Sequence, residues 1–251
     1  MFEVAFIQEK GSGRLMPESG LVRDHCVQIG LPIELYTPKR IHRRQLPLTR
    51  RCFVFGDMDC MHGAMRQLKI PIPDAVYFPP SLTQYLHRKI WLDTLGNVRK
   101  RIEDGAAAVF AKPASRAKVF TGQIFSNHSD FYHVAQTSWR EPVWCSEVVA
   151  WQSEYRVYVN GNDIVSVDYY AGDANVVLNL NVVTHAVALY ARSGEAPAAF
   201  GIDFGVLASG ETALVEANDG YALGAYQISS TAYTQLMFVR WRQLLASPQG
   251  D

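Results

Sequence analysis

Two short apolar runs in the C-terminal half of the 251-residue chain carry three polar residues at regular positions, and they constrain the fold more than any other feature. The first run, residues 198–207, contains Asp203, and the second, residues 212–218, contains Glu216 and Asn218. Short apolar runs that are separated by a few small or polar residues are typical of a β-hairpin. We therefore expect the three polar side chains to be held on two rigid neighbouring strands.

The spacing within this hairpin predicts that the three side chains converge. If Ser209 and Gly210 are the two residues of the turn, residues whose numbers add up to 419 face each other, so Asp203 lies opposite Glu216. Asn218 shares their face, because alternate side chains of a strand point to the same side. Carboxylate and amide oxygens without sulfur or imidazole suit Mg²⁺, and we expect Mn²⁺ to substitute for it. A solvated hairpin that happens to carry acids is the alternative.

An apolar strand that ends in a lysine predicts a phosphate-binding loop. Residues 106–113 are small or apolar apart from Lys112, and the small-residue segment that follows carries Arg116 and Lys118. Backbone N–H groups of such a loop can approach phosphate oxygens closely, and lysine supplies a compact positive charge. Residues 102–251 contain only eight Lys or Arg against fifteen Asp or Glu, so three cations within one loop are a local concentration rather than an even scatter over a solvated face.

Residues 143–159 read as a strand, a hinge and a second strand. Glu154, Arg156 and Tyr158 alternate with aromatic or apolar residues, so one face of the second strand is polar and the other packs inward. The Asn-Gly pair at 160–161 predicts a tight turn into a further strand. Taken alone, a hairpin with charged residues on its exposed face would be the better explanation of this segment.

The first hundred residues predict a small α/β layer. Their apolar runs alternate with helix-like segments, which favours a parallel sheet. Strands are expected at residues 4–7, 33–36 and 52–55, and helices at residues 18–29 and 58–68. Beyond this layer we expect a helix over residues 82–103, with Arg88 and Lys89 as candidates for a phosphate contact, and a closing helix over residues 231–245.

Composition indicates a chain that can bury a large core and that shows neither a membrane nor a disulfide signature. Apolar residues make up 48% of the sequence, and the formal net charge is zero. No apolar stretch approaches ~18 residues, the length that argues for a membrane span, and the first ten residues do not resemble a signal peptide. The four cysteines form no Cys-x-x-Cys pair, so buried free thiols in a reducing cytoplasm are expected.

The order of these motifs resembles the ATP-grasp superfamily. A strand lysine at position 112 is followed by a Glu-x6-Glu-x-Arg segment and then by Asp-x12-Glu-x-Asn, over roughly residues 85–228. The shorter motifs Lys-Pro, Phe-Thr-Gly, Glu-Tyr-Arg and Val-Glu-Ala-Asn are similar to the branch called the R-two-K clade. The resemblance implies an α/β fold with α+β character in the C-terminal part. We expect a small N-terminal parallel-sheet domain at residues 1–80 and two α+β subdomains that grip ATP, at residues 81–145 and 146–251.

The resemblance also implies a role for each motif residue. Lys112 would contact the α or β phosphate of ATP, and Lys118 would close over the β and γ phosphates. Lys118 and Arg156 would be the catalytic cations, and Glu154 would accept hydrogen bonds from ribose hydroxyls. The hinge that binds the adenine would consist of Glu147, Val148 and Val149. One or two Mg²⁺ ions would be held by Asp203, Glu216 and Asn218.

The implied activity is ATP-dependent carboxylate–amine ligation. Members of the superfamily typically form an acylphosphate from a carboxylate and ATP, and an amine then attacks it with release of ADP and phosphate. The expected substrates are small-molecule or peptide carboxylates and amines, and an oligomer, if one forms, is expected to be a dimer. The chain departs from the D-alanine:D-alanine ligase pattern at Gly201, where those enzymes place an arginine two residues before the metal aspartate, and Arg156 is the candidate to replace it.

Two other functions stay open on the sequence. A nucleotide-binding module without ligase activity, either kinase-like or regulatory, is favoured by Gly201 and disfavoured by the complete metal triad. The basic cluster at residues 39–51 has six Lys or Arg in thirteen residues, which could bind RNA or an acidic peptide. A solvated connection between strands is the preferred interpretation of this cluster, because it has no interleaved aromatics and no base-reading motif. We therefore expect neither a nucleic-acid partner nor a membrane partner.

Several residues close to the hairpin are candidates for substrate contacts. Asp168 and Asp173 lie at and beyond a strand end, where ordinary loop acids are equally expected. The segment that follows Asn218 is rich in glycine and small residues and can line an acceptor pocket. Its candidate contacts are Tyr221, Tyr226 and Ser229.

Overall fold

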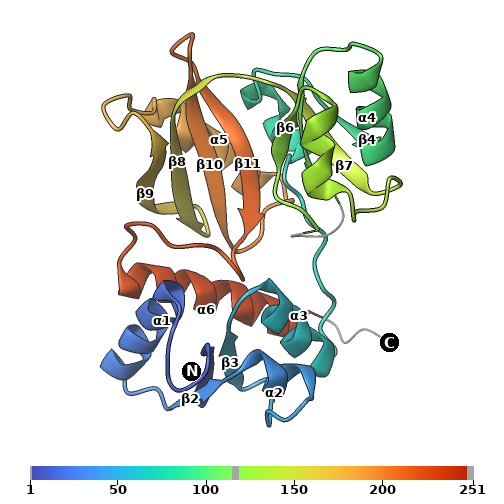
Figure 1. The fold of residues 1–251 in the computed structure, drawn as a ribbon. Coiled ribbons are helices and arrows are strands. Elements are labelled where there is room, and N and C mark those ends of the chain that lie inside the picture. Colours follow the sequence, from blue (N-terminus) through green and yellow to red (C-terminus); the bar gives the residue numbers. More distant parts are fainter. Residues whose placement is uncertain (1, 115–118, 248–251) are drawn as a thin grey trace.

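The computed structural model describes residues 2–114 and 119–247, which form three β-sheets with six α-helices. Figure 1 shows a lower body, built on the N-terminal sheet, and two antiparallel sheets side by side above it. Within the described ranges, none of the helices combines the length and the apolar character that are needed to span a bilayer.

The N-terminal sheet has three parallel strands in the order β2-β1-β3. Its elements are β1 (Val4–Gln8), α1 (Pro17–Gln28), β2 (Ile33–Tyr36), α2 (Pro38–His42), β3 (Cys52–Phe55) and α3 (Met58–Gln67). The three strands and two helices that the sequence predicts here are confirmed, with bounds that differ by one residue at most. The short helix α2 was not expected. It begins at Pro38, because the fixed φ of proline suits the first helical position.

Helix α2 overlaps the start of the basic cluster of residues 39–51, and part of that cluster is paired with acids of the same layer. Arg40 donates to Glu34 at 2.7 Å, and Arg51 donates to Glu3 at 2.8 Å. Both pairs are exposed at the surface. These contacts support the interpretation of the cluster as a solvated connection between strands.

The second sheet is antiparallel, with the strand order β4-β7-β5-β6. Its region contains two 3-10 helices, η1 (Pro80–Tyr85) and η2 (His128–Val134), with β4 (Ile90–Thr94), α4 (Leu95–Glu103), β5 (Val109–Pro113), β6 (Gln123–Phe125) and β7 (Pro142–Glu147). The single helix expected over residues 82–103 is therefore wrong. Residues 90–94 form a strand because they pair along their whole length with β7, and this tertiary pairing overrides the local helical pattern. Helix α4 begins only after Thr94, whose hydroxyl accepts from the backbone N–H of Asn97 at 3.2 Å.

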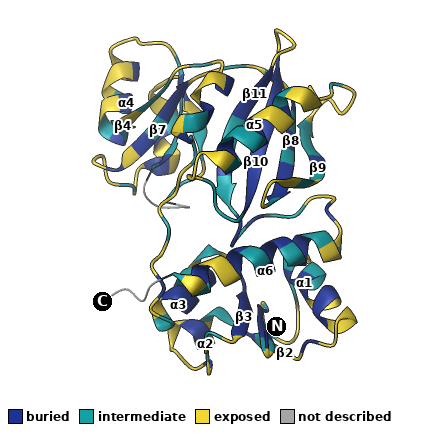
Figure 2. Ribbon diagram, turned by 180° about the vertical axis from the view of Figure 1, so that it is seen from behind, coloured by how far each residue is buried: buried dark blue, intermediate teal, exposed yellow. Residues whose placement is uncertain are grey.

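The third sheet is antiparallel, with the strand order β11-β10-β8-β9. Its elements are β8 (Trp151–Asn160), β9 (Asp163–Gly172), α5 (Leu180–Arg192), β10 (Ala199–Leu207) and β11 (Thr212–Asp219). The tight turn predicted at residues 160–161 is confirmed, because Asn160 faces Asp163 and Gly161 has a φ of 63°. Figure 2 shows α5 lying across one face of this sheet, where Val157 and Ile202 are buried. The opposite face carries the alternate residues of the same strands.

Helix α6 (Ser230–Ala246) returns from the third sheet to the N-terminal sheet and confirms the closing helix expected over residues 231–245. Its Trp241 donates from Nε1 to the backbone carbonyl of Cys52 in β3 at 2.9 Å. The inward face of the helix is buried and carries Tyr233, Leu236, Met237, Trp241 and Leu244. The last helix thus shares one core with the N-terminal sheet and its helices, up to Ile70. Domain limits at 1–80, 81–145 and 146–251 stay a prediction.

Candidate active site

The β10–β11 hairpin brings the three predicted metal ligands onto one face of the third sheet. Asp203 lies opposite Glu216, and Gly201 lies opposite Asn218. The side chains of the two acids are only 3% and 23% exposed. The facing pair expected from the spacing is therefore present, while metal binding by these residues stays a prediction.

The turn that produces this register differs from the expected two-residue turn. Phe204 faces Leu214, so near the turn the numbers of facing residues add up to 418 rather than 419. The backbone N–H of Leu207 donates to the carbonyl of Glu211 at 2.9 Å, which leaves three residues in the loop. Val215 is then an extra residue in the second strand, and this β-bulge restores the register at the two acids. Without the bulge, the second acid would lie on the core face of the sheet.

Arg88, which precedes β4, holds this bulge in place. Its guanidinium donates to the backbone carbonyls of Leu214 at 2.6 Å, Val215 at 2.9 Å and Leu86 at 3.0 Å, and it lies 5.1 Å from the ring centroid of Trp151. Burial lowers the pKa of Arg88 to about 10, although neighbouring carboxylates oppose the shift. The group stays charged at neutral pH, and the structure gives it backbone carbonyls as partners in place of the phosphate suggested by the sequence.

Replacing Arg88 with Met is expected to lower the free energy of unfolding by about 2–3 kcal/mol, because the carbonyls of the bulge lose a charged donor in a partly buried place. Urea denaturation of the purified protein measures this change. Lys89→Met is the matched control, since Lys89 is exposed, and its effect should stay within about 0.5 kcal/mol. Equal stability of the two variants would contradict this role of Arg88.

Arg156 and Asp203 form a buried ion pair at the centre of the polar face. Nε and Nη2 of Arg156 donate to the two carboxylate oxygens at 2.8 and 2.7 Å, and only 11% of the arginine side chain is exposed. Burial alone would lower the pKa of Arg156, but the hydrogen bonds and charge of Asp203 raise it above its usual range. The guanidinium is therefore permanently charged and has a fixed orientation.

Arg156 lies next to Gly201, where the D-alanine:D-alanine ligase pattern has an arginine. A Cβ on Gly201 would stand 3.6 Å from Cδ of Arg156 and 2.9 Å from Cδ2 of Leu223. A larger residue at position 201 would thus clash first with Leu223, while Arg156 from the neighbouring strand β8 lies at an ordinary contact distance. This arrangement supports Arg156 as the source of the guanidinium that the sequence lacks at position 201.

Lys112 connects the second sheet to the third. It lies on β5, donates from Nζ to the carboxylate of Glu216 on β11, and lies 3.3 Å from the ring centroid of Tyr77. Burial alone would raise the pKa of Glu216, but Lys112 and Asn218 lower it below its usual range. The lysine and the ionised carboxylate therefore balance each other between the two sheets.

Glu154 lies on β8, on the same face as Arg156, behind two aromatic side chains. It accepts a hydrogen bond from the hydroxyl of Tyr170 at 3.0 Å, and burial raises its pKa. Tyr170 stacks on Tyr226 with ring centroids 4.9 Å apart, and Tyr226 lies 5.4 Å from the guanidinium of Arg156. Glu154 is thus partly shielded from solvent, and its contact with ribose stays a prediction.

The predicted adenine hinge lies where the second sheet continues into the third. Glu147 ends β7, and Val148 and Val149 lead to β8. The backbone N–H of Glu147 donates to the carbonyl of Lys89 at 3.1 Å, and its carboxylate accepts from the N–H of Lys89 at 2.9 Å. These bonds fix the hinge backbone, while adenine recognition stays a prediction. Lys118 lies outside the described residues.

The oxygen ligands on this face suit a hard divalent cation. Nδ2 of Asn218 lies 3.0 Å from Oε1 of Glu216 and 3.5 Å from Oδ2 of Asp203, so the amide and both carboxylates converge on one place. Within residues 2–114 and 119–247, no group of three or more His, Cys, Asp or Glu side chains is arranged to hold a metal. A cation on this face would therefore take the amide oxygen as its third protein ligand, which Mg²⁺ accepts.

Three other candidates from the sequence have structural partners. Asp168 is buried, and its Oδ2 accepts from the backbone N–H of Gln227 at 2.6 Å, so it anchors the segment after β11. Ser229 accepts from the N–H of Ala232 at 3.2 Å and caps helix α6. Asp173 accepts from the N–H of the nearby Asn175 at 2.9 Å, as an ordinary loop acid does.

The cysteines are buried free thiols, as the sequence predicts. Burial raises the pKa of Cys60 and Cys145 to about 12 and that of Cys26 to about 11. These thiols are protonated at neutral pH and are poor nucleophiles. None of them belongs to the polar face described above.

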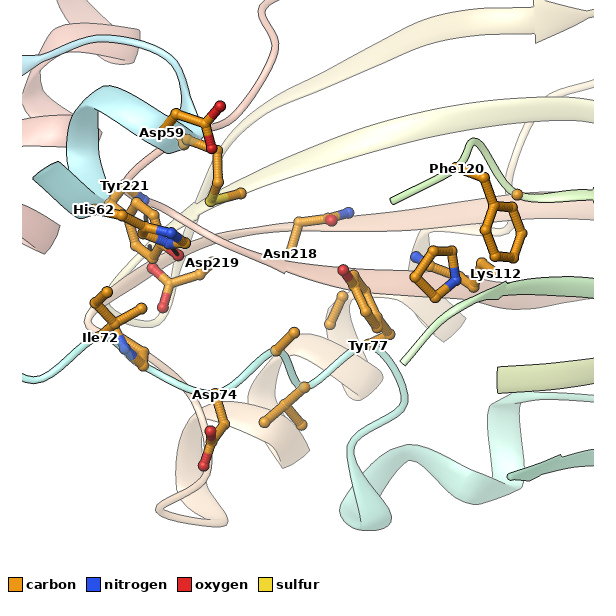
Figure 3. A pocket seen from close by; sticks show the side chains of 18 residues that line it. Asp59, His62, Ile72, Asp74, Tyr77, Lys112, Phe120, Asn218, Asp219 and Tyr221 are labelled. Atoms are coloured by element: carbon orange, nitrogen blue, oxygen red, sulfur yellow. Dashed lines mark hydrogen bonds between the residues drawn. The ribbon is translucent and has the colours of Figure 1, made fainter. Parts of the chain in front are cut away.

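A cavity of about 590 Å³ opens beside Lys112 and Asn218. Figure 3 shows Lys112 and Phe120 at one end, His62 and Tyr221 at the other, and Asn218 between them. Its volume is in the range of small-molecule sites. His62 was not marked by the sequence, because it lies in the N-terminal layer, 159 residues from its partner Tyr221, and belongs to no local motif.

The comparison with protein families decides the assignment of the chain. A family model for the ATP-grasp domain, family 2 of the R-two-K clade, matches residues 85–236. The chain belongs to the R-two-K clade of the ATP-grasp superfamily. The resemblance seen in the sequence motifs is thereby confirmed, for the superfamily and for the clade. No curated protein matches this R-two-K sequence.

Solved structures share the ATP-grasp fold of this R-two-K protein. D-cycloserine synthetase DcsG is 12% identical, with a TM-score of 0.58 over 96% of this chain and 99% of that chain. D-alanyl-alanine synthetase A from Vibrio cholerae is 9% identical, with a TM-score of 0.56 over 98% and 99% of the two chains. The macrocyclase MdnC from Microcystis aeruginosa, bound with its precursor peptide MdnA, is 10% identical, with a TM-score of 0.53 over 94% and 99%. At these identities, the likeness shows the fold alone.

Proposed function

We propose that this R-two-K protein is an ATP-dependent ligase that joins a carboxylate to an amine through an acylphosphate and releases ADP and phosphate. The observation that carries the proposal is the convergence of cations and oxygen ligands between two sheets. Lys112 comes from the second sheet, while Arg156 and Glu216 come from the third. Fixed charges of this kind can neutralise the charge that develops during phosphoryl transfer.

In phosphoryl transfer the protein mainly positions the reacting groups and neutralises charge, and it needs to form no covalent bond itself. In the proposed mechanism, Lys112 exchanges its bond to Glu216 for the α or β phosphate of ATP. Arg156, held by Asp203, faces the γ phosphate and the developing acylphosphate. Lys118 closes over the β and γ phosphates. This division of roles agrees with the two hydrogen bonds that fix Arg156 to Asp203, and with the bond from Lys112 to Glu216, which is its one side-chain hydrogen bond within the described residues.

The remaining motif residues bind the rest of the nucleotide and the metal. Glu154 accepts hydrogen bonds from the ribose hydroxyls, and the backbone of residues 147–149 binds the adenine. Mg²⁺, with Mn²⁺ as a substitute, would be held as one or two ions by Asp203, Glu216 and Asn218. When bound, Mg²⁺ neutralises phosphate oxygens and helps to orient them.

We propose that the substrates are a small-molecule or peptide carboxylate and an amine. The cavity of about 590 Å³ beside Lys112 has room for a small molecule or for the end of a peptide. Among proteins of this fold, the structure of MdnC is described as bound with a precursor peptide, and DcsG is named for a small-molecule product. A cytoplasmic location is part of the proposal, because free thiols suit a reducing compartment.

Release of ADP and phosphate from Mg²⁺-ATP tests the proposed function. The assay contains pooled amino acids, short peptides and simple carboxylates, and the expected result is ADP release that requires both the pool and Mg²⁺. ATP binding without pool-dependent release would contradict ligation and would favour the second candidate, a kinase-like or regulatory nucleotide-binding module. Gly201 is the feature that favours this second candidate. Release of AMP in place of ADP would contradict the acylphosphate and indicate adenylation.

A further inference from the structure

A histidine–tyrosine pair at the far end of the large cavity has no role in the nucleotide site. His62 lies on α3, and Tyr221 lies in the segment after β11. Nε2 of His62 is 2.9 Å from the hydroxyl of Tyr221, and their ring centroids are 5.8 Å apart. Both line the cavity that Lys112 and Asn218 also line (Figure 3). The pair therefore lines the same cavity as Lys112 and Asn218, a proposed phosphate ligand and a proposed metal ligand.

The Tyr221 hydroxyl fixes the orientation of the His62 ring. Tyr221 is only 6% exposed, and burial raises its pKa, so the hydroxyl is protonated at neutral pH. Among the described residues, Nδ1 of His62 has no hydrogen-bond partner. When Nε2 carries the ring proton and donates it to the tyrosine oxygen, Nδ1 presents a free lone pair.

The surroundings of His62 favour the neutral form of its ring. The acids that line the cavity favour a positively charged ligand. Burial lowers the pKa of His62, Arg66 lowers it further, and Asp59 opposes the shift. A neutral imidazole at pH 7 can accept a proton. Asp59 and Asp74 also line the cavity and are exposed, so their charges favour an ammonium group as it enters.

We propose that this cavity holds the amine substrate and that His62 accepts the proton that the amine gives up. The inference rests on the proposed ligase function. An ammonium group gives one proton to Nδ1 of His62, and the freed lone pair attacks the carbonyl carbon of the acylphosphate. The C–N bond forms as the C–O bond to phosphate breaks. The phosphate leaves with that electron pair and takes the second proton from the nitrogen, and Tyr221 is the positioning residue that holds the ring.

The test compares an amine that needs a proton acceptor with one that does not. Hydroxylamine is neutral at pH 7 and traps an acylphosphate as a hydroxamate. The His62→Gln protein is assayed with Mg²⁺-ATP and the pool described above, with and without hydroxylamine. We expect amide formation to fall ~100-fold or more, while hydroxamate formation stays within about threefold of the unchanged protein. Tyr221→Phe should reduce amide formation by about tenfold, because the ring loses its orienting bond.

His133→Gln is the matched control, since His133 is exposed and does not line the cavity. It should leave both products unchanged. Amide formation that survives His62→Gln would overturn the inference, and so would an equal loss of amide and hydroxamate. If the unchanged protein forms no hydroxamate, the proposed ligase function itself fails, and this inference fails with it.

Discussion

Glu216→Gln is expected to lower Mg²⁺-dependent ADP release at least ~100-fold while leaving the protein folded. The glutamine keeps the shape of the side chain but loses the charge that holds Lys112 and that would hold the cation. The hairpin register comes from backbone pairing and from the bulge at Val215, neither of which needs the carboxylate. Steady-state ADP release at several Mg²⁺ concentrations measures the effect.

Glu211→Gln is the matched control for this variant. Glu211 lies next to the turn of the same hairpin, its side chain is 56% exposed, and its partners Ser209 and His87 lie outside the polar face. We expect its ADP release to equal that of the unchanged protein. Full activity of Glu216→Gln would show that the metal assignment is wrong.

Arg156→Met is expected to lower the free energy of unfolding by about 3–5 kcal/mol and to abolish turnover. Methionine retains much of the apolar stem but leaves the carboxylate of Asp203, whose side chain is 3% exposed, without its two hydrogen bonds. A buried charge without a partner is strongly destabilising. Urea denaturation measures the stability, and ADP release measures the activity.

A double variant separates the two effects of Arg156. Replacing Arg156 with Met and Asp203 with Leu removes both charges, and we expect much of the stability to return because buried ion pairs can often be replaced by apolar residues. Activity should stay absent. Arg99→Met, which breaks the exposed pair of Arg99 with Glu103, should cost less than about 1 kcal/mol. A double variant that regains turnover would contradict the proposed role of the guanidinium.

Side-chain alternation was enough to predict which residues of β8 and β10 share a face, whereas on β11 the bulge at Val215 also decides the face of Glu216. Asp203 and Glu216 lie on the polar face. Ile202 and Phe204, which flank Asp203 on β10, belong to the core under α5. The same period-two pattern placed Arg156 on the polar face of its strand, and the structure shows that this strand, β8, pairs with β10 so that Arg156 faces Asp203. Such predictions succeed because one face of a sheet is buried and a shift by one residue would reverse every side chain.

Contacts between segments that are distant in the chain could not be predicted from the sequence. The bulge at Val215 depends on Arg88, which comes more than a hundred residues earlier in the chain. No local sequence pattern predicts that contact. The local sequence predicts a helix for residues 90–94, because a short stretch of sequence carries no information about their pairing with β7. His62 was missed for the same reason, since Tyr221 meets it only in the folded chain.

Titration of Mg²⁺-ATP into the protein by calorimetry tests the central claim most directly, because it requires no knowledge of the other substrates. We predict binding at millimolar or lower ATP, weakened at least ~10-fold in Lys112→Ala, a loss of about 1.4 kcal/mol or more in binding free energy. Lys39→Ala, in the basic cluster, should bind as the unchanged protein does. Absence of binding at millimolar ATP and Mg²⁺, or equal binding by Lys112→Ala, would contradict the assignment of this face as a nucleotide site.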